Sequence, residues 1–293
     1  MTALGKMKEV AVLFEKGGLD DPAREAEILI TGVLDIDRAE LYSGDALVAP
    51  ELSEHISSLA ERRMMGEPIQ YLVGHAEFYG LQIYVGRGVL IPRPETELLV
   101  EETIKTVKRR VSSAERQKNQ SGPAIAILDL CTGSGCIALA LASHFPEAVV
   151  YGVDSSEAAL VYATQNALAN NIRNIRFLLG DLFEAVRDMN FDCIVSNPPY
   201  IRHDEIKTLQ REVRDYEPVE ALDGGKDGLD FYRRIFRSAP SHMTKDGTVM
   251  LEIGYNQAAE IRELATRSGF MQPKFIKDFA DIERVAVLER SWN

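Results

Sequence analysis

The stretch Ile125-Ala-Ile-Leu-Asp-Leu-Cys-Thr-Gly-Ser-Gly135 decides the fold of this chain of 293 residues. Its apolar first half reads as a buried strand, and its two glycines allow the backbone to bend tightly. An apolar helix is predicted directly after it, over residues 136–144. A strand, a glycine turn and a helix in this order are typical of a parallel α/β sheet, in which ligands bind beyond the carboxyl ends of the strands.

The alternation of apolar strands and helices continues to the C-terminus. Strands are predicted over residues 125–130, 149–153, 175–179, 193–196, 249–253, 274–278 and 285–288. Helices are predicted over residues 136–144, 157–169, 229–238 and 256–268. This pattern indicates an α/β fold with a Rossmann-like, seven-stranded, mostly parallel sheet and helices on both of its faces.

Residues 1–75 predict a separate, small helical-bundle domain. A helix expected over residues 50–65 places Leu52, Ile56 and Leu59 on its inward face. The region contains no obvious catalytic residues. Its role is therefore either to stabilise the chain or to recognise a partner.

Residues 76–90 change character, because apolar residues alternate with polar ones and glycines interrupt them, which predicts a β-hairpin linker. The larger α/β domain is then expected over residues 91–293. It starts with a stiff Pro-rich loop and a helix that reaches about Val111. Residues 112–123 are polar and are predicted to form a mobile loop.

The chain is acidic, with a formal net charge of −12, and it has 45% hydrophobic and 27% charged residues. These fractions are typical of a globular protein with a full core. The negative balance argues against direct binding of nucleic acid, which needs clustered positive charge. It fits either a basic protein partner or plain solubility.

Targeting and metal-binding signals are absent from the sequence. No apolar run is long enough to span a bilayer, and the N-terminus does not read as a signal peptide. Cys131, Cys136 and Cys193 lack metal-ligand spacing, so we expect reduced thiols in a cytoplasmic protein. The histidines do not cluster with Cys or Asp, and no metal site is predicted.

A nucleoside site is predicted where the first three strands of the sheet end. Asp154 can accept both hydroxyls of a ribose, although it can also cap the next helix. Asp181 and Leu182 can face an adenine amine and ring, or can simply form a turn. Leu139 replaces the third glycine of the dinucleotide fingerprint, and no lysine follows the turn to hold phosphates. A nucleoside without a phosphate anchor suits S-adenosylmethionine.

The motif Asn197-Pro-Pro-Tyr200 follows the fourth strand of the sheet. Two prolines make a rigid segment that cannot continue as a helix. At this edge of the sheet the motif offers an amide, free carbonyls and an aromatic ring. It therefore predicts a site for a planar NH₂ group, on a base or on an amide. The alternative is a Pro-rich turn that only closes the strand.

The glycine turn, Asp154 and the Asn-Pro-Pro-Tyr motif together resemble the class I S-adenosylmethionine-dependent methyltransferases that act on planar nitrogens. Further motifs narrow the resemblance to the peptide chain release factor glutamine methyltransferases, the PrmC or HemK family. These motifs are Gln70-Tyr-Leu-Val-Gly74, Glu77-Phe-Tyr-Gly80, Ile91-Pro-Arg-Pro-Glu-Thr-Glu97, Tyr216-Glu-Pro218, Ala221-Leu222, Gly225-Lys-Asp-Gly228 and Leu251-Glu-Ile-Gly254.

The resemblance implies methylation of the side-chain amide nitrogen, N5, of the glutamine in the Gly-Gly-Gln motif of translation release factors. It implies that the helical domain helps to bind the release factor, and a monomer is expected. The implied cofactor residues are Asp129, Cys131, Thr132, Gly133, Ser134, Gly135, Asp154, Asp181, Leu182 and Asn197. The implied substrate residues are Asn197, Pro198, Pro199 and Tyr200.

The sequence departs from the family at Cys131, where the family has a glycine. A positive φ there would strain a residue that carries a Cβ. In the expected mechanism, the Asn197 side-chain oxygen and the Pro198 carbonyl each accept one hydrogen of the glutamine NH₂. Tyr200 is expected to cover the amide. No general base is required, because the proton can leave after methyl transfer.

Three other functions share some of these features. An adenine-N6 methyltransferase would use the same motif on a flipped base but needs a basic groove. A non-catalytic release-factor or ribosome-binding protein would not need Asn197 and Asp154. A nicotinamide oxidoreductase conflicts with the incomplete glycine fingerprint.

Other polar residues are expected to be structural. Glu252 is predicted to be a structural hydrogen-bond acceptor rather than a substrate ligand. Arg93 and Glu97 are expected to form a buried pair that fixes their loop. Cys131 and Cys136 are predicted to pack rather than to act as nucleophiles.

Overall fold

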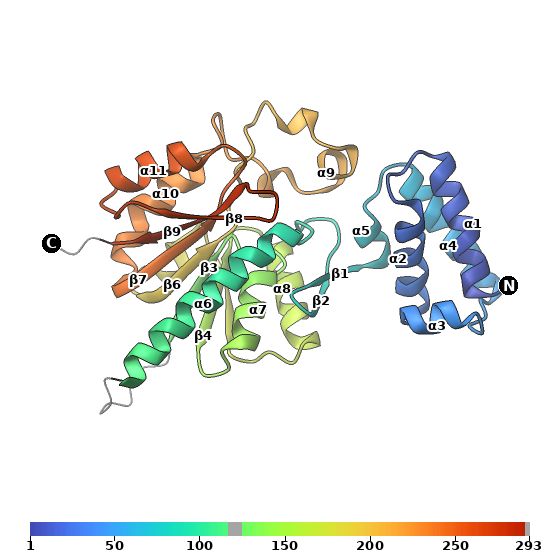
Figure 1. Ribbon diagram of the computed structural model, residues 1–293, viewed down its shortest axis with the longest axis horizontal. Coiled ribbons are helices and arrows are strands. Elements are labelled where there is room, and N and C mark those ends of the chain that lie inside the picture. Colours follow the sequence, from blue (N-terminus) through green and yellow to red (C-terminus); the bar gives the residue numbers. More distant parts are fainter. Residues whose placement is uncertain (117–124, 291–293) are drawn as a thin grey trace. The chain divides into compact units, whose positions relative to one another are not determined.

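The computed structural model describes residues 1–116 and 125–290, and its larger unit is built around a seven-stranded sheet (Figure 1). In spatial order the strands are β5 (Ile175–Leu179), β4 (Val149–Asp154), β3 (Ala126–Leu130), β6 (Phe191–Ser196), β7 (Met243–Glu252), β9 (Glu283–Glu289) and β8 (Lys274–Lys277). The β5–β4–β3–β6–β7 pairs are parallel, whereas β9 runs antiparallel to β7 and β8. The predicted α/β class and mostly parallel sheet are confirmed.

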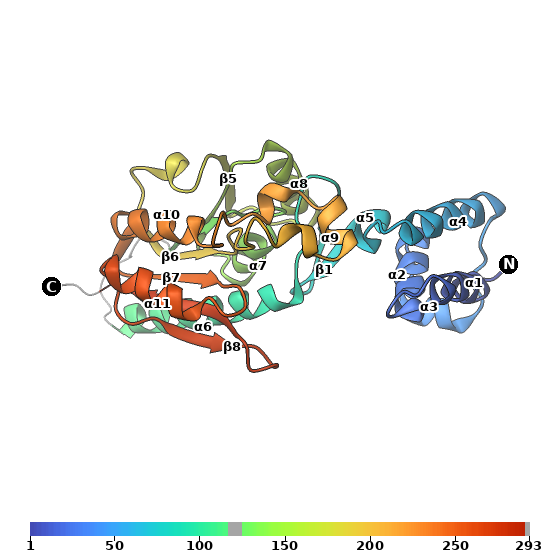
Figure 2. The same ribbon diagram turned by 90° about the horizontal axis from the view of Figure 1, so that it is seen from above.

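Helices cover both faces of this sheet, as predicted. One face carries α6 (Pro94–Arg116), α7 (Cys136–His144) and α8 (Glu157–Ala169), and the other carries α10 (Asp230–Ser238) and α11 (Ala258–Arg267) (Figure 1). Figure 2 looks onto the face with α10 and α11. Short 3-10 turns lie at Glu184–Val186, Ile206–Thr208, Val219–Ala221 and Ala239–Ser241. Because both faces are covered, β3 is buried along nearly its whole length, which explains its continuous apolar run.

Two boundaries differ from the prediction by about five or six residues, and the others by no more than about two. Helix α6 continues past Val111 to Arg116, so the predicted loop starts later, and its remainder at residues 117–123 lies outside the described residues. Strand β7 begins at Met243 rather than at residue 249, because Met243 pairs with Phe191 beyond an irregularity in the ladder. The polar residues after Met243 carry no apolar signal for a strand.

The N-terminal helices form a unit with a core of its own. They are α1 (Ala3–Lys16), α2 (Pro22–Leu34), α3 (Arg38–Ser43), α4 (Pro50–Met64) and α5 (Ile69–Val73). The short helices α3 and α5 were not predicted. The inward placement of Leu52 was wrong: Leu52 is 40% exposed because it lies in the first turn of α4, whereas Ile56 and Leu59 are buried.

This helical unit also contains residues 85–87 and 210–216, which are distant in sequence. Helix α9 (Arg211–Tyr216) contributes Glu212, whose carboxylate lies 2.8 Å from the Arg63 guanidinium. Arg63 also binds Glu25 on α2. The predicted domain boundaries at residues 75 and 90 are not tested by this grouping and stay predictions.

One buried amide, that of Asn166, binds the β-hairpin of β1 (His75–Phe78) and β2 (Leu81–Tyr84). Asn166 of α8 accepts the Tyr84 N–H at 2.7 Å and donates to the carbonyls of Tyr84 and Ser134, at 3.1 and 2.9 Å. Its side chain is fully buried. Asn166 thereby connects the hairpin to the glycine turn after β3.

None of the helices in the described ranges is long and apolar enough to cross a membrane.

Asn166→Ala should lower the free energy of unfolding by about 2–4 kcal/mol, because it leaves buried backbone groups of Tyr84 and Ser134 without partners. Asn170→Ala is the matched control: Asn170 lies one turn further along α8 and binds the Gln82 carbonyl at an exposed site. It should cost less than about 1 kcal/mol. Urea unfolding of both variants measures the difference, and equal losses would contradict the assigned role of Asn166.

Candidate functional site

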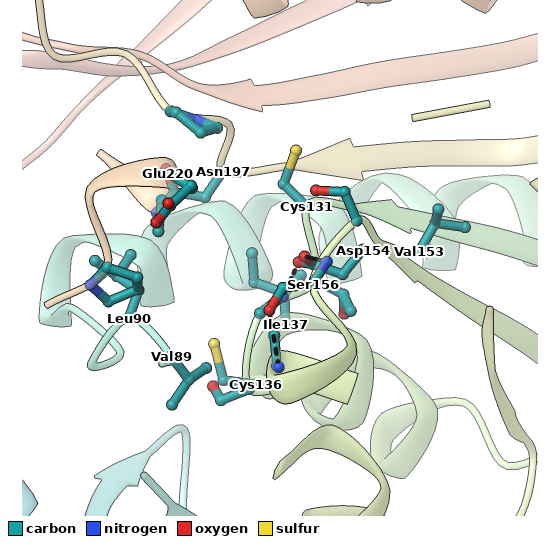
Figure 3. A pocket seen from close by; sticks show the side chains of 18 of the residues that line it. Val89, Leu90, Cys131, Cys136, Ile137, Val153, Asp154, Ser156, Asn197 and Glu220 are labelled. Carbon is teal, nitrogen blue, oxygen red and sulfur yellow. Dashed lines mark hydrogen bonds between the residues drawn. The ribbon is translucent and has the colours of Figure 1, made fainter. Parts of the chain in front are cut away.

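A cavity of about 370 Å³ lies where the polar motifs after β3, β4, β5 and β6 meet. This is the carboxyl edge of the parallel sheet, where α/β folds place their ligands. Of the residues predicted for the site, those that line the cavity are Cys131, Thr132, Gly133, Ser134, Asp154, Asp181, Leu182, Asn197 and Pro199. Asn197 and Asp154 lie on opposite sides of it in Figure 3, with Cys131 between them.

Asp129 holds the glycine turn from the buried core, on the side away from the cavity. It is fully buried, and its Oδ2 accepts hydrogen bonds from the Thr132 hydroxyl at 2.6 Å and the Ala138 N–H at 3.2 Å. Burial raises the pKa of its carboxyl group to about 7. Asp129 and Gly135 are not among the described residues that line the cavity. Asp129 therefore shapes the turn without reaching its ligand side.

Asp154 at the end of β4 joins the turn to the neighbouring strand. Its Oδ2 accepts the Gly133 N–H at 2.8 Å and its Oδ1 accepts the Ser156 N–H at 2.9 Å. Burial raises its pKa, and these N–H donors oppose the rise. The cap of α8 is Ser156 rather than Asp154. Each Asp154 oxygen keeps a lone pair for a donor in the cavity.

The turn itself has a left-handed backbone at three positions. Cys131, Gly133 and Gly135 have φ values of 57°, 55° and 80°. A Cβ on Gly133 would meet only Val89, at 3.9 Å, so open space lies over this glycine. Cys131 adopts the same conformation although it carries a Cβ, which costs about 1–2 kcal/mol of backbone strain.

The residues after β5 are divided between two environments. Leu182 is buried, lines the cavity and has a φ of 53°. Asp181 also lines the cavity, but its carboxylate lies 2.5 Å from the Arg234 guanidinium of α10. A ligand amine at Asp181 would therefore share this carboxylate with Arg234.

Asn197 belongs to a chain of hydrogen bonds that reaches two other elements. Its Nδ2 donates to Thr96 Oγ1 at 3.2 Å, and the Thr96 hydroxyl donates to Glu252 Oε2 at 2.6 Å. The Tyr200 hydroxyl donates to Glu252 Oε1 at 3.3 Å. Glu252 is buried, and burial raises its pKa to about 7. Glu252 thus acts as a hydrogen-bond acceptor behind the motif.

The remaining residues of the Asn-Pro-Pro-Tyr motif differ in exposure. Pro198 and Pro199 are buried and Tyr200 is half-buried. Among the described residues, Pro199 lines the cavity whereas Pro198 and Tyr200 do not. Burial raises the pKa of Tyr200, so its phenol stays protonated.

The expected pair of Arg93 and Glu97 is wrong. Arg93 lies 2.5 Å from Glu217, whose second oxygen accepts the Ile91 N–H at 3.1 Å. Glu97 instead accepts the Tyr79 N–H at 2.8 Å. The loop before α6 is therefore fixed by Glu217, from a segment more than a hundred residues later in the chain.

Part of the cavity wall was not predicted. Apolar side chains of Val89, Leu90, Ile137 and Phe231 line it, together with Glu220 and Thr96. No local sequence signal marks these residues, because each lies in an ordinary loop or helix start. The wall therefore combines apolar surface with the carboxylates of Asp154, Asp181 and Glu220.

The three cysteine thiols are held in their protonated form. Burial raises the pKa of Cys131, and that of Cys136 and Cys193 to about 12, so these thiols stay protonated. Within residues 1–116 and 125–290, no cluster of His, Cys, Asp and Glu could hold a metal ion. The arrangement can bind a hydroxylated, cationic ligand beside Asp154 and a planar amide or amine beside Asn197.

Two family models match the chain. Residues 7–74 match the PrmC N-terminal domain, and residues 115–214 match the methyltransferase small domain.

Similar proteins cover nearly the whole chain. A release factor glutamine methyltransferase of Thermodesulfovibrio yellowstonii is 46% identical over 99% of both chains. One of Geobacter sulfurreducens is 41% identical over 93% of this chain and 91% of its own. A methyltransferase structure from Pyrococcus furiosus shares the fold, with a TM-score of 0.52 and 21% identity, over 73% of this chain and 90% of that one.

Cys131→Gly should give a more stable protein than Cys131→Ala, by about 1 kcal/mol, because glycine tolerates the φ of 57° without strain. Both variants remove the same sulfur atom, so the comparison isolates the backbone. Thermal unfolding of the pair measures the difference. Equal stability, or a more stable alanine variant, would show that the turn is unstrained at this position.

Proposed function

Because the chain belongs to the release factor glutamine methyltransferase family, we propose that it transfers a methyl group from S-adenosylmethionine to a glutamine of a translation release factor. The acceptor is the side-chain amide nitrogen, N5, of the glutamine in the Gly-Gly-Gln motif. Membership of this family makes the chain a methyltransferase. The observation that supports the specific reaction is the placement of Asp154 and Asn197 in one cavity.

The lining of the cavity fits S-adenosylmethionine. Asp154 keeps lone pairs for the ribose hydroxyls, and the space over Gly133 lets a ligand approach the backbone. Leu182 supplies an apolar contact for the adenine ring, and Asp181 an acceptor for its amine. Cys131, Thr132, Ser134 and Gly135 shape the turn around the ligand. The carboxylates of the wall favour a cationic sulfonium.

When bound, S-adenosylmethionine supplies an electrophilic methyl group on its sulfonium. The residues of the Asn-Pro-Pro-Tyr motif hold the acceptor. The Asn197 Oδ1 and the Pro198 carbonyl each accept one hydrogen of the glutamine NH₂. Pro198 and Pro199 keep this segment rigid, and Tyr200 covers the amide. The amide nitrogen held by Asn197 and Pro198 would take up this methyl group, and it would then lose a proton to water.

Positioning provides most of the catalytic effect in this scheme. An amide nitrogen is a poor nucleophile because its lone pair is delocalised over the carbonyl group. Holding the reacting atoms in line can contribute up to about 7–11 kcal/mol in favourable cases. The two acceptors also stabilise the positive charge that develops on the nitrogen.

Two further features of the chain, its N-terminal helical unit and its negative charge, agree with a protein substrate. The N-terminal helical unit has its own core, which suits a module that binds the release factor. The formal charge of −12 disfavours nucleic acid as the direct substrate. We place the enzyme in the cytoplasm, where release factors act, as a monomer.

Methyl transfer to a purified release factor tests this function. Incubation with labelled S-adenosylmethionine should place one methyl group on the glutamine of the Gly-Gly-Gln motif, located by mass spectrometry of peptides. Label on adenine in added RNA or DNA, with none on the factor, would identify an adenine methyltransferase instead. Cofactor binding without any transfer would identify a binding protein.

Asn197→Ala should reduce kcat by about a hundredfold or more, because it removes one of the two acceptors for the amide. Its affinity for S-adenosylhomocysteine, measured by calorimetry, should stay within about threefold of the wild type. Asn170→Ala, at an exposed site, serves as the control and should leave both quantities unchanged. Normal turnover of Asn197→Ala would remove Asn197 from the mechanism.

Asp154→Ala should weaken binding of S-adenosylhomocysteine by about 10–100-fold, because hydrogen bonds to a charged acceptor are worth about 1.5–3 kcal/mol. The measurement needs no release factor. Asp188→Asn removes the same charge from an exposed position outside the cavity and should bind normally. Equal affinities of the two variants would show that Asp154 does not contact the nucleoside.

A further inference from the structure

The hydrogen bonds behind Asn197 have one consistent direction. The Thr96 hydroxyl has a single hydrogen, and it lies 2.6 Å from Glu252 Oε2, the shorter of its two contacts. With Glu252 ionised, this hydrogen is donated to the carboxylate, so Thr96 Oγ1 can only accept from Asn197. The atom of the Asn197 amide that faces Thr96 has to be Nδ2, because two acceptors cannot share a hydrogen bond without a hydrogen.

This direction determines which end of the amide meets a ligand. With Nδ2 held by Thr96, Oδ1 is turned away from Thr96 and is available on the cavity side, where Asn197 forms part of the lining. A flipped amide would present its NH₂ to the NH₂ of a glutamine. Two donors would then face each other, and the acceptor required for the substrate would be lost.

We propose that Thr96 and Glu252 are positioning residues that fix the Asn197 amide in the orientation that accepts a substrate NH₂. This inference rests on the proposed function, since it explains how the same site selects an amide nitrogen. Neither residue touches the reacting atoms in the scheme. Thr96 lies at the start of α6 and Glu252 at the end of β7, so this chain of hydrogen bonds joins two elements to the motif after β6.

This direction of the hydrogen bonds from Asn197 through Thr96 requires Glu252 in its ionised form. A carboxylate accepts from both the Thr96 and the Tyr200 hydroxyls, as observed. A protonated Glu252 would carry a hydrogen of its own, and donation of that hydrogen to Thr96 would release the Thr96 hydroxyl to hold a flipped Asn197.

The charge of Glu252 is set by its surroundings. Burial is the largest influence and raises its pKa to about 7; the Thr96 and Tyr200 hydroxyls and the Arg284 cation lower it, and Glu95 raises it. The groups that face Glu252 come from α6, the segment after β6, α10 and β9. They are Glu95, Thr96, Tyr200, Tyr232 and Arg284. Since the ionised form is the competent one, kcat should rise with pH through about 7.

Two substitutions at Thr96 separate its hydroxyl from its shape: Thr96→Val keeps the size of the side chain, and Thr96→Ser keeps the hydroxyl but loses a methyl group. Thr96→Ser keeps the hydroxyl and should retain kcat within about threefold, whereas Thr96→Val removes it and should lower kcat about tenfold or more. KM for the release factor and the affinity for S-adenosylhomocysteine should change little in both. Thermal unfolding shows that each variant is folded at the assay temperature. Wild-type kcat in Thr96→Val would overturn the proposal.

The pH profile provides the second measurement. The wild-type kcat should fall as the pH drops below about 7, because Glu252 becomes protonated. Glu252→Gln has no carboxylate to titrate, so its kcat should be low at every pH and show no such fall. Asp129 also has a pKa of about 7, so an acid limb that persists in Glu252→Gln would contradict the role of Glu252. Failure of the wild type to methylate the factor would contradict the proposed function itself, and the two failures are therefore distinguishable.

Discussion

The hydrogen bond from the Gly133 N–H to Asp154 Oδ2 is the interaction on which the site depends. It joins the turn after β3 to the end of β4, while Asp129 holds the same turn from below. The left-handed backbone of the turn is kept in place by these two carboxylates, although Cys131 is strained there. Without this anchor, the Asp154 carboxylate and the open space over Gly133 would not face one cavity.

The large features of the fold could be predicted from the sequence because they follow from burial. Strands such as β3 and β6 are covered on both faces and read as apolar runs, and α7 follows the glycine turn directly. Short helices such as α3 carry too few turns for a periodic signal. The exposure of Leu52 and the grouping of residues 210–216 with the N-terminal helices depend on tertiary contacts, which local periodicity does not contain.

In the site, too, local sequence signals identified some residues, whereas tertiary contacts between distant residues could not be predicted. Residues at strand ends, such as Asp154 and Asn197, were found because topology alone brings strand ends together. Partners distant in sequence were not found. Arg93 binds Glu217 rather than Glu97, and Thr96 binds Glu252, a residue 156 positions later in the chain. Such pairs leave no local pattern, yet they determine the orientation of the groups that a motif search identifies.

In the proposed reaction, one cavity holds a nucleoside at Asp154 and a glutamine amide at Asn197, and Thr96 orients the amide of Asn197. A crystal structure of the protein with S-adenosylhomocysteine and glutamine measures this directly. We expect the ribose hydroxyls on the Asp154 carboxylate, and the glutamine nitrogen within hydrogen-bond distance of Asn197 Oδ1 and the Pro198 carbonyl. A glutamine that places its carbonyl oxygen, rather than its nitrogen, against Asn197 would contradict it.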